Sequence, residues 1–219
     1  MYKIIHGDCI QELKKLANES VDLILTDPPY GNDESYCRDK RTIVSDEHPL
    51  TGLLALAEAY RVLRRNRCCF FFLDAKHLAF IDSFVRRYTA YRVRSYCVWD
   101  KRLMGLGYGI RPRHEMILAL EKGKPVYRSG GFANVLTHPR AVTNREHPHK
   151  KPVEILTPLI AHTTAPGDLV LDPFAGSGST GVAAVQLGRD FIGIECAYKY
   201  VQVARARLAA DDSGLRDAA

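Results

Sequence analysis

The sequence predicts an α/β fold in which a mostly parallel sheet carries helices on both faces. Short apolar runs alternate with stretches whose apolar residues recur at helical spacing, which is the pattern of strands joined by helices. Some runs are apolar at every position, as expected of strands covered on both sides. With 219 residues, 46% of them hydrophobic and 26% charged, the chain is long enough for one domain with a full core.

The first 120 residues contain five expected strands and three expected helices. Apolar residues at helical spacing, such as Ile10, Leu13 and Leu16, mark the helices. The stretch 68–73 is apolar throughout, whereas 92–99 alternates in polarity, and both patterns predict strands. We expect strands at 2–6, 21–26, 68–73, 92–99 and 114–120, and helices at 10–16, 50–63 and 75–88.

The rest of the chain continues the alternation. Pro152 suits the first turn of a helix over 153–162, and Pro158 inside that pattern predicts a kink or a shifted boundary. Strands at 168–171 and 191–195 alternate with helices at 179–187 and 198–208. The polar and small residues 211–219 predict a frayed tail. The stretches 31–49 and 122–150 lack clear periodicity, and loops that long are usually functional or mobile.

Composition and charge narrow the class of protein. No apolar run approaches the roughly 20 residues that span a bilayer, and no signal-peptide pattern is seen, so we expect a cytoplasmic protein. The six cysteines form no C-x-x-C pair, which favours free thiols over a zinc site. The net charge of +6, with basic and aromatic residues interleaved over 91–113, favours a nucleic-acid partner.

A glycine-rich turn follows the expected strand 168–171 and precedes the helix 179–187. Gly176 and Gly178 permit backbone angles closed to other residues, so a ligand can approach the chain closely. Glu195 ends the next strand, where its carboxylate can accept hydrogen bonds from both hydroxyls of a ribose. This arrangement predicts a site for an adenosine-type cofactor.

The same turn also satisfies the G-x-G-x-x-G pattern over 176–181, so an NAD-dependent oxidoreductase is the rival interpretation. Two features count against it. Asp172, Pro173 and Phe174 separate the strand from the glycines, and the stretch after Glu195 is too short for a second mononucleotide-binding half. A phosphate-binding P-loop is excluded, because Val182 stands where that motif needs lysine.

A D-P-P-Y sequence, Asp27, Pro28, Pro29 and Tyr30, follows the expected strand 21–26. An aromatic base amine is a poor nucleophile, because its lone pair is delocalised into the ring. The Asp27 carboxylate and the Pro28 carbonyl could accept its two N–H groups and favour a pyramidal nitrogen, while Tyr30 stacks on the base. With a cofactor loop in the same chain, the turn predicts methyl transfer to a base amine by proximity and orientation, without a metal.

These motifs, in this order, resemble the permuted (beta-class) S-adenosylmethionine-dependent DNA amino-methyltransferases of the D-P-P-Y type. The resemblance covers residues 6–9, 21–30, 99–101, 113–115, 147–152 (an H-P-x-x-K-P sequence) and 191–208. It implies a Rossmann-like methyltransferase fold with circularly permuted motif order. It also implies S-adenosylmethionine as methyl donor and double-stranded DNA with a flipped target base as substrate, so that the protein is associated with the nucleoid when it acts.

The resemblance assigns roles to single residues. The catalytic residues are Asp27, Pro28, Pro29 and Tyr30. The candidate cofactor contacts are Asp8, Cys9, Asp27, Lys151, Asp172, Phe174, Gly176, Ser177, Gly178, Thr180 and Glu195. The adenine enzymes of this family usually carry Asp in the first motif position and the N4-cytosine enzymes usually Ser, so Asp27 favours the N6 amine of adenine. The alternatives are an N4-cytosine enzyme, a catalytically silent nucleic-acid-binding relative and the oxidoreductase.

The interval between the middle strands and the H-P-x-x-K-P sequence is short. It spans 121–146, where members with longer DNA sites carry a substantial target-recognition region, so we expect a short or relaxed recognition site. Candidate DNA contacts are Arg113, Arg128, Arg140 and Arg145. A homodimer, common in this family, would enlarge the DNA-binding surface. The chain is then one domain, with a catalytic half (1–120), a target-recognition segment (121–150), a cofactor half (151–210) and the frayed tail.

Overall fold

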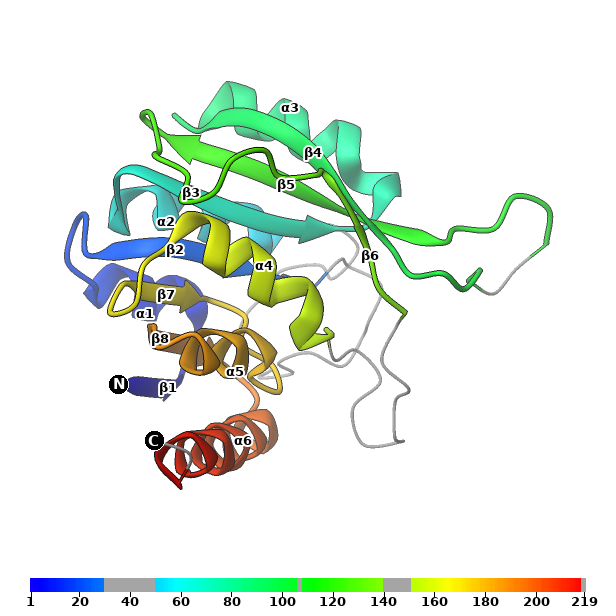
Figure 1. Cartoon of the computed structure of the whole chain (residues 1–219). Coiled ribbons are helices and arrows are strands. Elements are labelled where there is room, and N and C mark those ends of the chain that lie inside the picture. The colour runs from blue at the N-terminus through cyan, green and yellow to red at the C-terminus, as the bar shows by residue number, and fades with distance from the viewer. Residues whose placement is uncertain (30–49, 106–107, 140–150, 218–219) are drawn as a thin grey trace.

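The computed structural model describes residues 1–29, 50–105, 108–139 and 151–217 (Figure 1). Within these residues, one sheet contains β1 (Tyr2–His6), β2 (Val21–Thr26), β3 (Leu63–Leu73), β4 (Arg92–Asp100), β5 (His114–Lys122), β6 (Val135–Thr137), β7 (Leu169–Asp172) and β8 (Asp190–Glu195). The helices are α1 (Cys9–Lys15), α2 (Leu50–Val62), α3 (Leu78–Tyr88), α4 (Val153–Thr163), α5 (Ser179–Gln186) and α6 (Tyr198–Asp217), and a 3₁₀ turn (Ala75–His77) precedes α3.

The strand order is β1-β8-β7-β2-β3-β5-β4-β6. In this order, the five strands β1, β8, β7, β2 and β3 are each parallel to their neighbours, and β6 is parallel to β4. Strand β5 is antiparallel to both of its neighbours, β3 and β4. The predicted α/β fold with a mostly parallel sheet is therefore confirmed.

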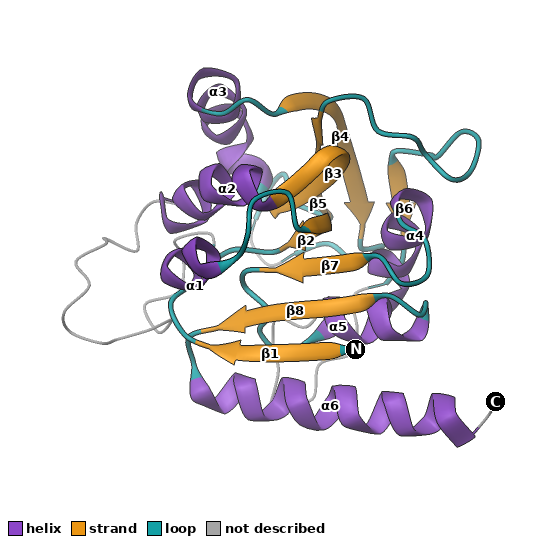
Figure 2. Cartoon of the chain, turned by 90° about the vertical axis from the view of Figure 1, so that its left-hand side faces the viewer, coloured by secondary structure: helices purple, strands orange, loops and turns teal. Residues whose placement is uncertain are grey.

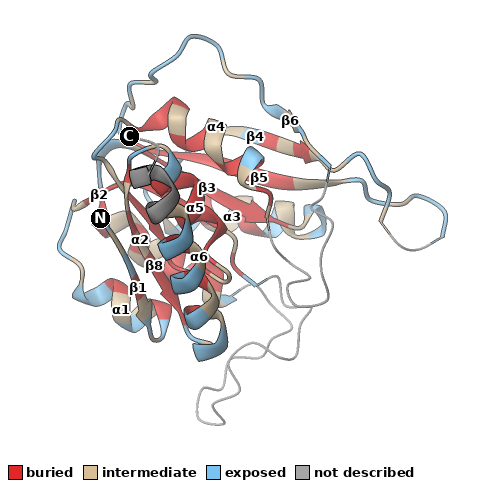
Figure 3. Ribbon diagram, turned by 60° about the horizontal axis from the view of Figure 1, so that its bottom comes forward, coloured by how far each residue is buried: buried red, intermediate tan, exposed pale blue. Residues whose placement is uncertain are grey.

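The sheet is buried on both sides, which explains why β3 is apolar at successive positions. Its side chains alternate between two core clusters: Phe70 and Phe72 pack with residues of α4, α5 and α6, whereas Cys69 and Phe71 pack with residues of α1, α2 and α3. Figure 2 shows α1, α2 and α3 on one side of the sheet and α4 and α5 on the other, with α6 running below β1. In Figure 3 the strands lie buried in the centre, and exposed residues gather on the outer sides of the helices.

Three details differ from the sequence-based expectation, and one of the two effects expected of Pro158, a shifted boundary, is not seen. Strand β3 begins before residue 68, because Leu63 already pairs with Val21. Strand β6 was not expected, since three residues are too short to show a period. Pro158 lies inside α4, so the helix boundary is not shifted. Helix α6 continues to residue 217, beyond the predicted end at 208, and a hydrogen bond from Gln186 to Asp211 (3.0 Å) ties this part of α6 to α5. The fraying of the last residues stays a prediction.

The structure also bears on the predictions about cysteines, metal sites and membrane spans. Cys9, Cys68, Cys69 and Cys97 are buried free thiols, as expected, whereas Cys196 is disulfide-bonded, which corrects the expectation for that residue. Among the described residues, no group of three or more histidine, cysteine, aspartate or glutamate side chains could hold a metal ion. No described helix has the length and apolarity needed to cross a membrane.

Candidate active site

The two sequence motifs meet at the centre of the sheet. Strands β2 and β7 are neighbours, with Leu23 opposite Val170 and Ile24 opposite Leu171. From β7 the chain continues outward to β8, and from β2 it continues in the other direction to β3. Such a switch in direction opens a crevice at the carboxyl ends of the two strands, where ligands bind in open α/β sheets. Asp27 directly follows β2, and Asp172 ends β7.

Asp172 joins the two motifs physically. One of its carboxylate oxygens accepts hydrogen bonds from the Thr26 hydroxyl (2.8 Å) and from the backbone N–H of Phe174 (3.0 Å). The other accepts a hydrogen bond from the Thr180 hydroxyl at the start of α5 (2.7 Å). The side chain is buried, and burial raises the pKa of Asp172 to about 6 despite these hydrogen bonds. Asp172 and Thr180 are both candidate cofactor contacts. Their mutual hydrogen bond fixes the two ends of the glycine-rich loop to each other.

Replacing Asp172 by Asn should make the free energy of unfolding less sensitive to pH. Because burial raises this carboxyl's pKa from 3.8 to about 6, its ionisation costs stability: the cost is absent below about pH 4 and grows as the pH rises through 6. At pH 7 it reaches at most about 3 kcal/mol. Asparagine keeps the shape, and the Thr180 hydroxyl can rotate to accept from the new amide. Urea unfolding at several pH values from 4 to 7 gives the free energy of unfolding of both proteins. The free energy of D172N relative to that of the wild type should rise with pH, and a constant difference would contradict this.

The glycine-rich loop adopts the backbone that its glycines permit. Gly176 and Gly178 have φ of +51° and +80°, the left-handed region that favours glycine. A Cβ on Gly178 would also lie 3.0 Å from the Cβ of Ala204, so this position allows α6 to approach the loop. The guanidinium of Arg207 on α6 donates to the carbonyl (2.5 Å) and the hydroxyl (3.0 Å) of Ser177. The loop is therefore held from α6.

Glu195, at the carboxyl end of β8, closes the other side of the loop. Its carboxylate accepts hydrogen bonds from the backbone N–H groups of Gly176 (2.9 Å) and Ala197 (2.7 Å). Burial raises the pKa of Glu195, although these hydrogen bonds oppose the shift. A carboxylate offers about four acceptor positions, so further donors such as ribose hydroxyls can still bind it.

The first strand brings Asp8 and Cys9 to the same edge of the sheet. The backbone N–H of Gly7 donates to the carbonyl of Glu195 (3.0 Å), and Asp8 then caps α1 by accepting from the N–H of Gln11 (2.9 Å). The Cys9 side chain is buried, and burial raises the pKa of its thiol to about 12. Cys9 is therefore a neutral core thiol beneath this edge.

Asp27 is held by a row of alternating charges. The Lys151 ammonium lies 2.5 Å from one carboxylate oxygen of Asp27 and 3.1 Å from Glu115 at the start of β5. Glu115 also pairs with Lys101, at 3.3 Å. The Lys151 ammonium further lies 5.5 Å from the centre of the Phe72 ring. The sequence placed Lys151 among the cofactor contacts; the structure places it between Asp27 and Glu115.

The charges in this row support one another. Burial alone would raise the pKa of Glu115, but the cations of Lys151 and Lys101 outweigh burial and hold it below its usual value. Burial alone would lower the pKa of Lys151, but the carboxylates of Asp27 and Glu115 outweigh burial and raise it. Glu115 and Lys151 thus stabilise each other's charged forms, and Lys151 fixes the Asp27 carboxylate at the end of β2.

The two predicted DNA contacts that the structure describes, Arg113 and Arg128, lie apart. Arg113 makes two hydrogen bonds to Asp100 (2.7 and 2.5 Å) where β4 and β5 leave the sheet, on the same edge as Asp27. The N–H of Arg128 donates to the carbonyl of His162 (2.9 Å), near the end of α4, which leads into the amino end of β7. Arg128 therefore lies at the opposite edge. Tyr30, Arg140 and Arg145 lie outside the described residues.

The described part of the expected recognition segment packs against α4. The rings of Tyr127 and Phe132 each stack on His162, with centroids 4.8 Å apart, and the Ser129 hydroxyl is hydrogen-bonded to the His162 ring (2.6 Å). Residues 121–122 belong to β5 and 135–137 to β6. This segment therefore covers one face of the sheet up to residue 139.

Sequence reasoning missed three side chains that shape the site. Glu115 and Lys101 complete the charge row, and Arg207 holds the glycine-rich loop. The one available signal was Glu115, an acidic residue at the start of an otherwise apolar run. Nothing in the pattern of α6 distinguishes Arg207 from its other basic residues.

Comparison with known proteins decides the family. A family model described as "DNA methylase" matches residues 129–206. The "Putative methylase YubD" of Escherichia coli (strain K12) is 36% identical over 223 aligned residues, which cover 100% of this chain and 95% of that protein. The chain belongs to the N6/N4 DNA methylase family. It is accordingly a DNA methyltransferase, and the resemblance stated from its motifs is confirmed.

Two further matches agree with this family. The "DNA adenine methyltransferase YhdJ" of the same organism is 32% identical, over 94% of this chain and 82% of its own length. The crystal structure of an M1.HpyAVI–SAM complex superposes with a TM-score of 0.74 and 27% identity, covering 95% of this chain and 99% of that one. The Rossmann-like methyltransferase fold is thereby confirmed, and the oxidoreductase alternative falls away.

Proposed function

We propose that this methyltransferase transfers a methyl group from S-adenosylmethionine to the N6 amine of an adenine flipped out of double-stranded DNA. The observation that carries the proposal is Asp27, held by Lys151 at the switch point between β2 and β7, beside the loop that Glu195 closes. The base-amine site and the cofactor site are thus next to each other on one edge of the sheet.

The Asp27 turn suits the chemistry of an aromatic amine. The Asp27 carboxylate and the Pro28 carbonyl can accept the two N–H groups of the base, which favours a nitrogen with an available lone pair. Lys151 orients the Asp27 carboxylate through their 2.5 Å contact, so the positioning of Asp27 is the role we assign to Lys151 in place of a cofactor contact. Proton loss can come late, because the amine becomes acidic only when it is methylated. Tyr30 is proposed to stack on the base.

The loop between β7 and α5 suits S-adenosylmethionine, which supplies a positively charged methyl group when bound. Glu195 can accept hydrogen bonds from the ribose hydroxyls, and the backbone at Gly176 and Gly178 lets the cofactor approach closely. Phe174, two residues after Asp172 and partly buried, supplies an apolar contact. Asp8, Ser177 and Asp172 complete the proposed site, with Cys9 and Thr180 behind it.

Adenine is favoured over cytosine by the residue at position 27. The resemblance associates Asp in this position with adenine enzymes, and the relative YhdJ is named as an adenine methyltransferase. An N4-cytosine enzyme is the second candidate, because the amine of cytosine has similar geometry.

The extent of DNA recognition is a further part of the proposal. A short or relaxed site is expected from the short 121–146 interval, and a homodimer would extend the contact surface. Methylome sequencing of cells that express the protein should find a site shorter than six base pairs. Light scattering at assay concentration gives the mass of the protein in solution, and a mass of the monomer alone would contradict the homodimer.

The function is tested by transfer of labelled methyl from S-adenosylmethionine to unmethylated duplex DNA and, in parallel, to RNA. We expect label in DNA. Calorimetry with S-adenosylmethionine accompanies the assay, because cofactor binding without transfer would instead support a catalytically silent relative. Transfer to RNA alone would contradict the proposed substrate.

Replacing Gly52 by Ala should slow methyl transfer through a displaced Pro28. Gly52 lies in α2, and a Cβ there would be 2.8 Å from the Cβ of Pro28, so the turn or the helix must shift. A misplacement approaching 1 Å can cost up to about 100-fold in rate, and we expect a loss of tenfold or more. Gly130→Ala is the control, because a Cβ there meets no atom within 4 Å. Single-turnover kinetics give the rate of methyl transfer for both variants. A Gly52→Ala rate equal to that of the wild type would contradict the expected displacement of Pro28.

A further inference from the structure

The hairpin between β4 and β5 extends well beyond the sheet, to the right in Figure 1. We call its described residues, 101–105 and 108–113, the β4–β5 arm. Its base is ordered by hydrogen bonds between the two sides. The N–H of Lys101 donates to the carbonyl of Arg113 (3.0 Å), and the N–H of Gly105 donates to the carbonyl of Pro112 (2.7 Å). The Arg111 side chain adds a third, to the carbonyl of Gly105 (2.7 Å).

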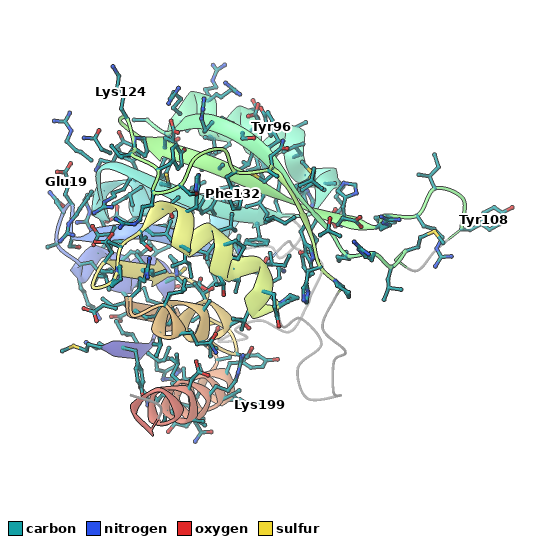
Figure 4. The ribbon with its side chains drawn as sticks, in the orientation of Figure 1. Glu19, Tyr96, Tyr108, Lys124, Phe132 and Lys199 are labelled. Atoms are coloured by element: carbon teal, nitrogen blue, oxygen red, sulfur yellow. The ribbon has the colours of Figure 1, made fainter. Side chains whose placement is uncertain are left out.

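The outer part of the arm exposes large apolar side chains. The exposed fractions are 65% for Leu103, 63% for Met104, 102% for Tyr108 and 104% for Ile110. Figure 4 shows Tyr108 at the far end of the arm, pointing away from the body of the protein. Single exposed apolar residues are ordinary, but several on one short hairpin indicate an interaction surface. They make no contribution to either core cluster.

The charge of the arm favours a polyanion as the partner. Between residues 101 and 113 there are four basic residues and no acidic residue. These are Lys101, Arg102, Arg111 and Arg113. Two of them, Lys101 and Arg113, pair at the base with Glu115 and Asp100, whereas Arg102 is exposed farther out. Basic groups beside aromatic and aliphatic side chains suit phosphates next to base faces.

The base of the arm is connected to the catalytic turn. Glu115 follows the arm by two residues and contacts Lys151 at 3.1 Å, and Lys151 contacts Asp27 at 2.5 Å. Strand β5 pairs with β3 so that Met116 lies opposite Leu73, which places the arm at the carboxyl edge of β3, beside that of β2. DNA whose base reaches Asp27 therefore lies within reach of the arm.

We propose that the β4–β5 arm inserts its apolar end into the duplex beside the flipped base, with Arg102 and Arg111 on neighbouring phosphates. This deepens the proposed function and rests on it. Extrusion of a base leaves a gap in the stack and costs unstacking energy. Apolar side chains insert between base steps in other DNA-binding proteins, and stacking of an aromatic ring on the exposed neighbouring bases would offset part of the cost. Tyr108 and Ile110 supply the wedge.

The test compares two arm variants with a matched control at the opposite edge. Tyr108→Ser/Ile110→Ser removes the wedge, and Arg102→Gln removes one exposed cation. Arg87→Gln/Tyr88→Ser is the control, because both residues are exposed at the end of α3, which leads into the amino end of β4, whereas the arm follows the carboxyl end of that strand. For each protein, fluorescence anisotropy gives the Kd for an unmethylated duplex from 50 to about 200 mM salt, and a methylation assay gives kcat/KM.

The wedge variant should bind the duplex roughly tenfold more weakly and lose kcat/KM by a similar factor. Arg102→Gln should lower the slope of log Kd against log salt by about one. Binding of S-adenosylmethionine and the control variant should match the wild type.

Other outcomes separate the arm from the proposed function. If the wild type methylates DNA and all variants equal it, the arm proposal fails and the function stands. If the arm variants bind DNA more weakly but the wild type transfers no methyl group, the function fails and the arm stands. If the wedge variant changes only the sedimentation of the free protein and not its Kd for DNA, the arm contacts a second copy of this chain, and the proposal is overturned.

Discussion

Replacing Asp27 by Ala should lower the rate of methyl transfer by at least about 100-fold, the effect expected when a positioned catalytic carboxylate is lost. The carboxylate is proposed to accept an N–H of the target amine and to take its proton after methylation. The fold should survive, because Lys151 keeps Glu115 as a partner at 3.1 Å. Single-turnover kinetics on unmethylated DNA measure the chemical step directly.

Asp27→Asn is the sharper variant of the same test. The amide keeps the size of the side chain and can still accept from Lys151, but it is a weaker acceptor and does not take a proton. Calorimetry with S-adenosylmethionine on both variants tests separately whether Asp27 also contacts the cofactor. A rate within tenfold of the wild type for Asp27→Asn would contradict the proposed role.

Replacing Lys151 by Met should reduce both stability and catalysis. The change leaves the partly buried Glu115 with Lys101 alone, and breaking a fully buried ion pair typically costs about 3–5 kcal/mol. We expect a loss near 3 kcal/mol, because Lys101 remains. The Asp27 carboxylate loses the contact that orients it, so kcat should fall more than tenfold. Urea unfolding and kcat at saturating DNA are the measurements.

A second substitution separates the two effects. In Lys151→Met/Glu115→Gln, no uncompensated buried carboxylate remains on β5, so stability should recover in part while kcat stays low. Lys199→Met is a matched control, because Lys199 lies exposed on α6 (Figure 4). Recovery of kcat together with stability would mean that Lys151 supports only the fold, which contradicts a positioning role for it.

The sequence predicted the elements and the motif positions well, because both depend on local patterns. Apolar runs such as Val21–Thr26 predicted the central strands, and Gly176 and Gly178 predicted a left-handed turn that the structure contains. Since the carboxyl ends of parallel strands meet at one edge, the meeting of Asp27 and Asp172 followed from the fold class.

What the sequence did not predict depends on tertiary contacts. Glu115 joins Lys151 only because β5 runs antiparallel to β3, a pairing that no local pattern determines. Arg128 was predicted as a DNA contact because it lies in the 121–146 interval, and its place at the edge opposite Asp27 follows from the packing of Tyr127 and Phe132 on His162, which no local pattern shows. The roles of Asp172 and Thr180 likewise follow from hydrogen bonds that join distant segments.

The measurement that tests the central claim most directly is nucleoside mass spectrometry of unmethylated duplex DNA after incubation with the protein and S-adenosylmethionine. We expect N6-methyladenine from the wild type and none above background from Asp27→Asn. N4-methylcytosine would keep the site and overturn the choice of base. Equal amounts of N6-methyladenine from both proteins would contradict catalysis by Asp27 at the switch point between β2 and β7.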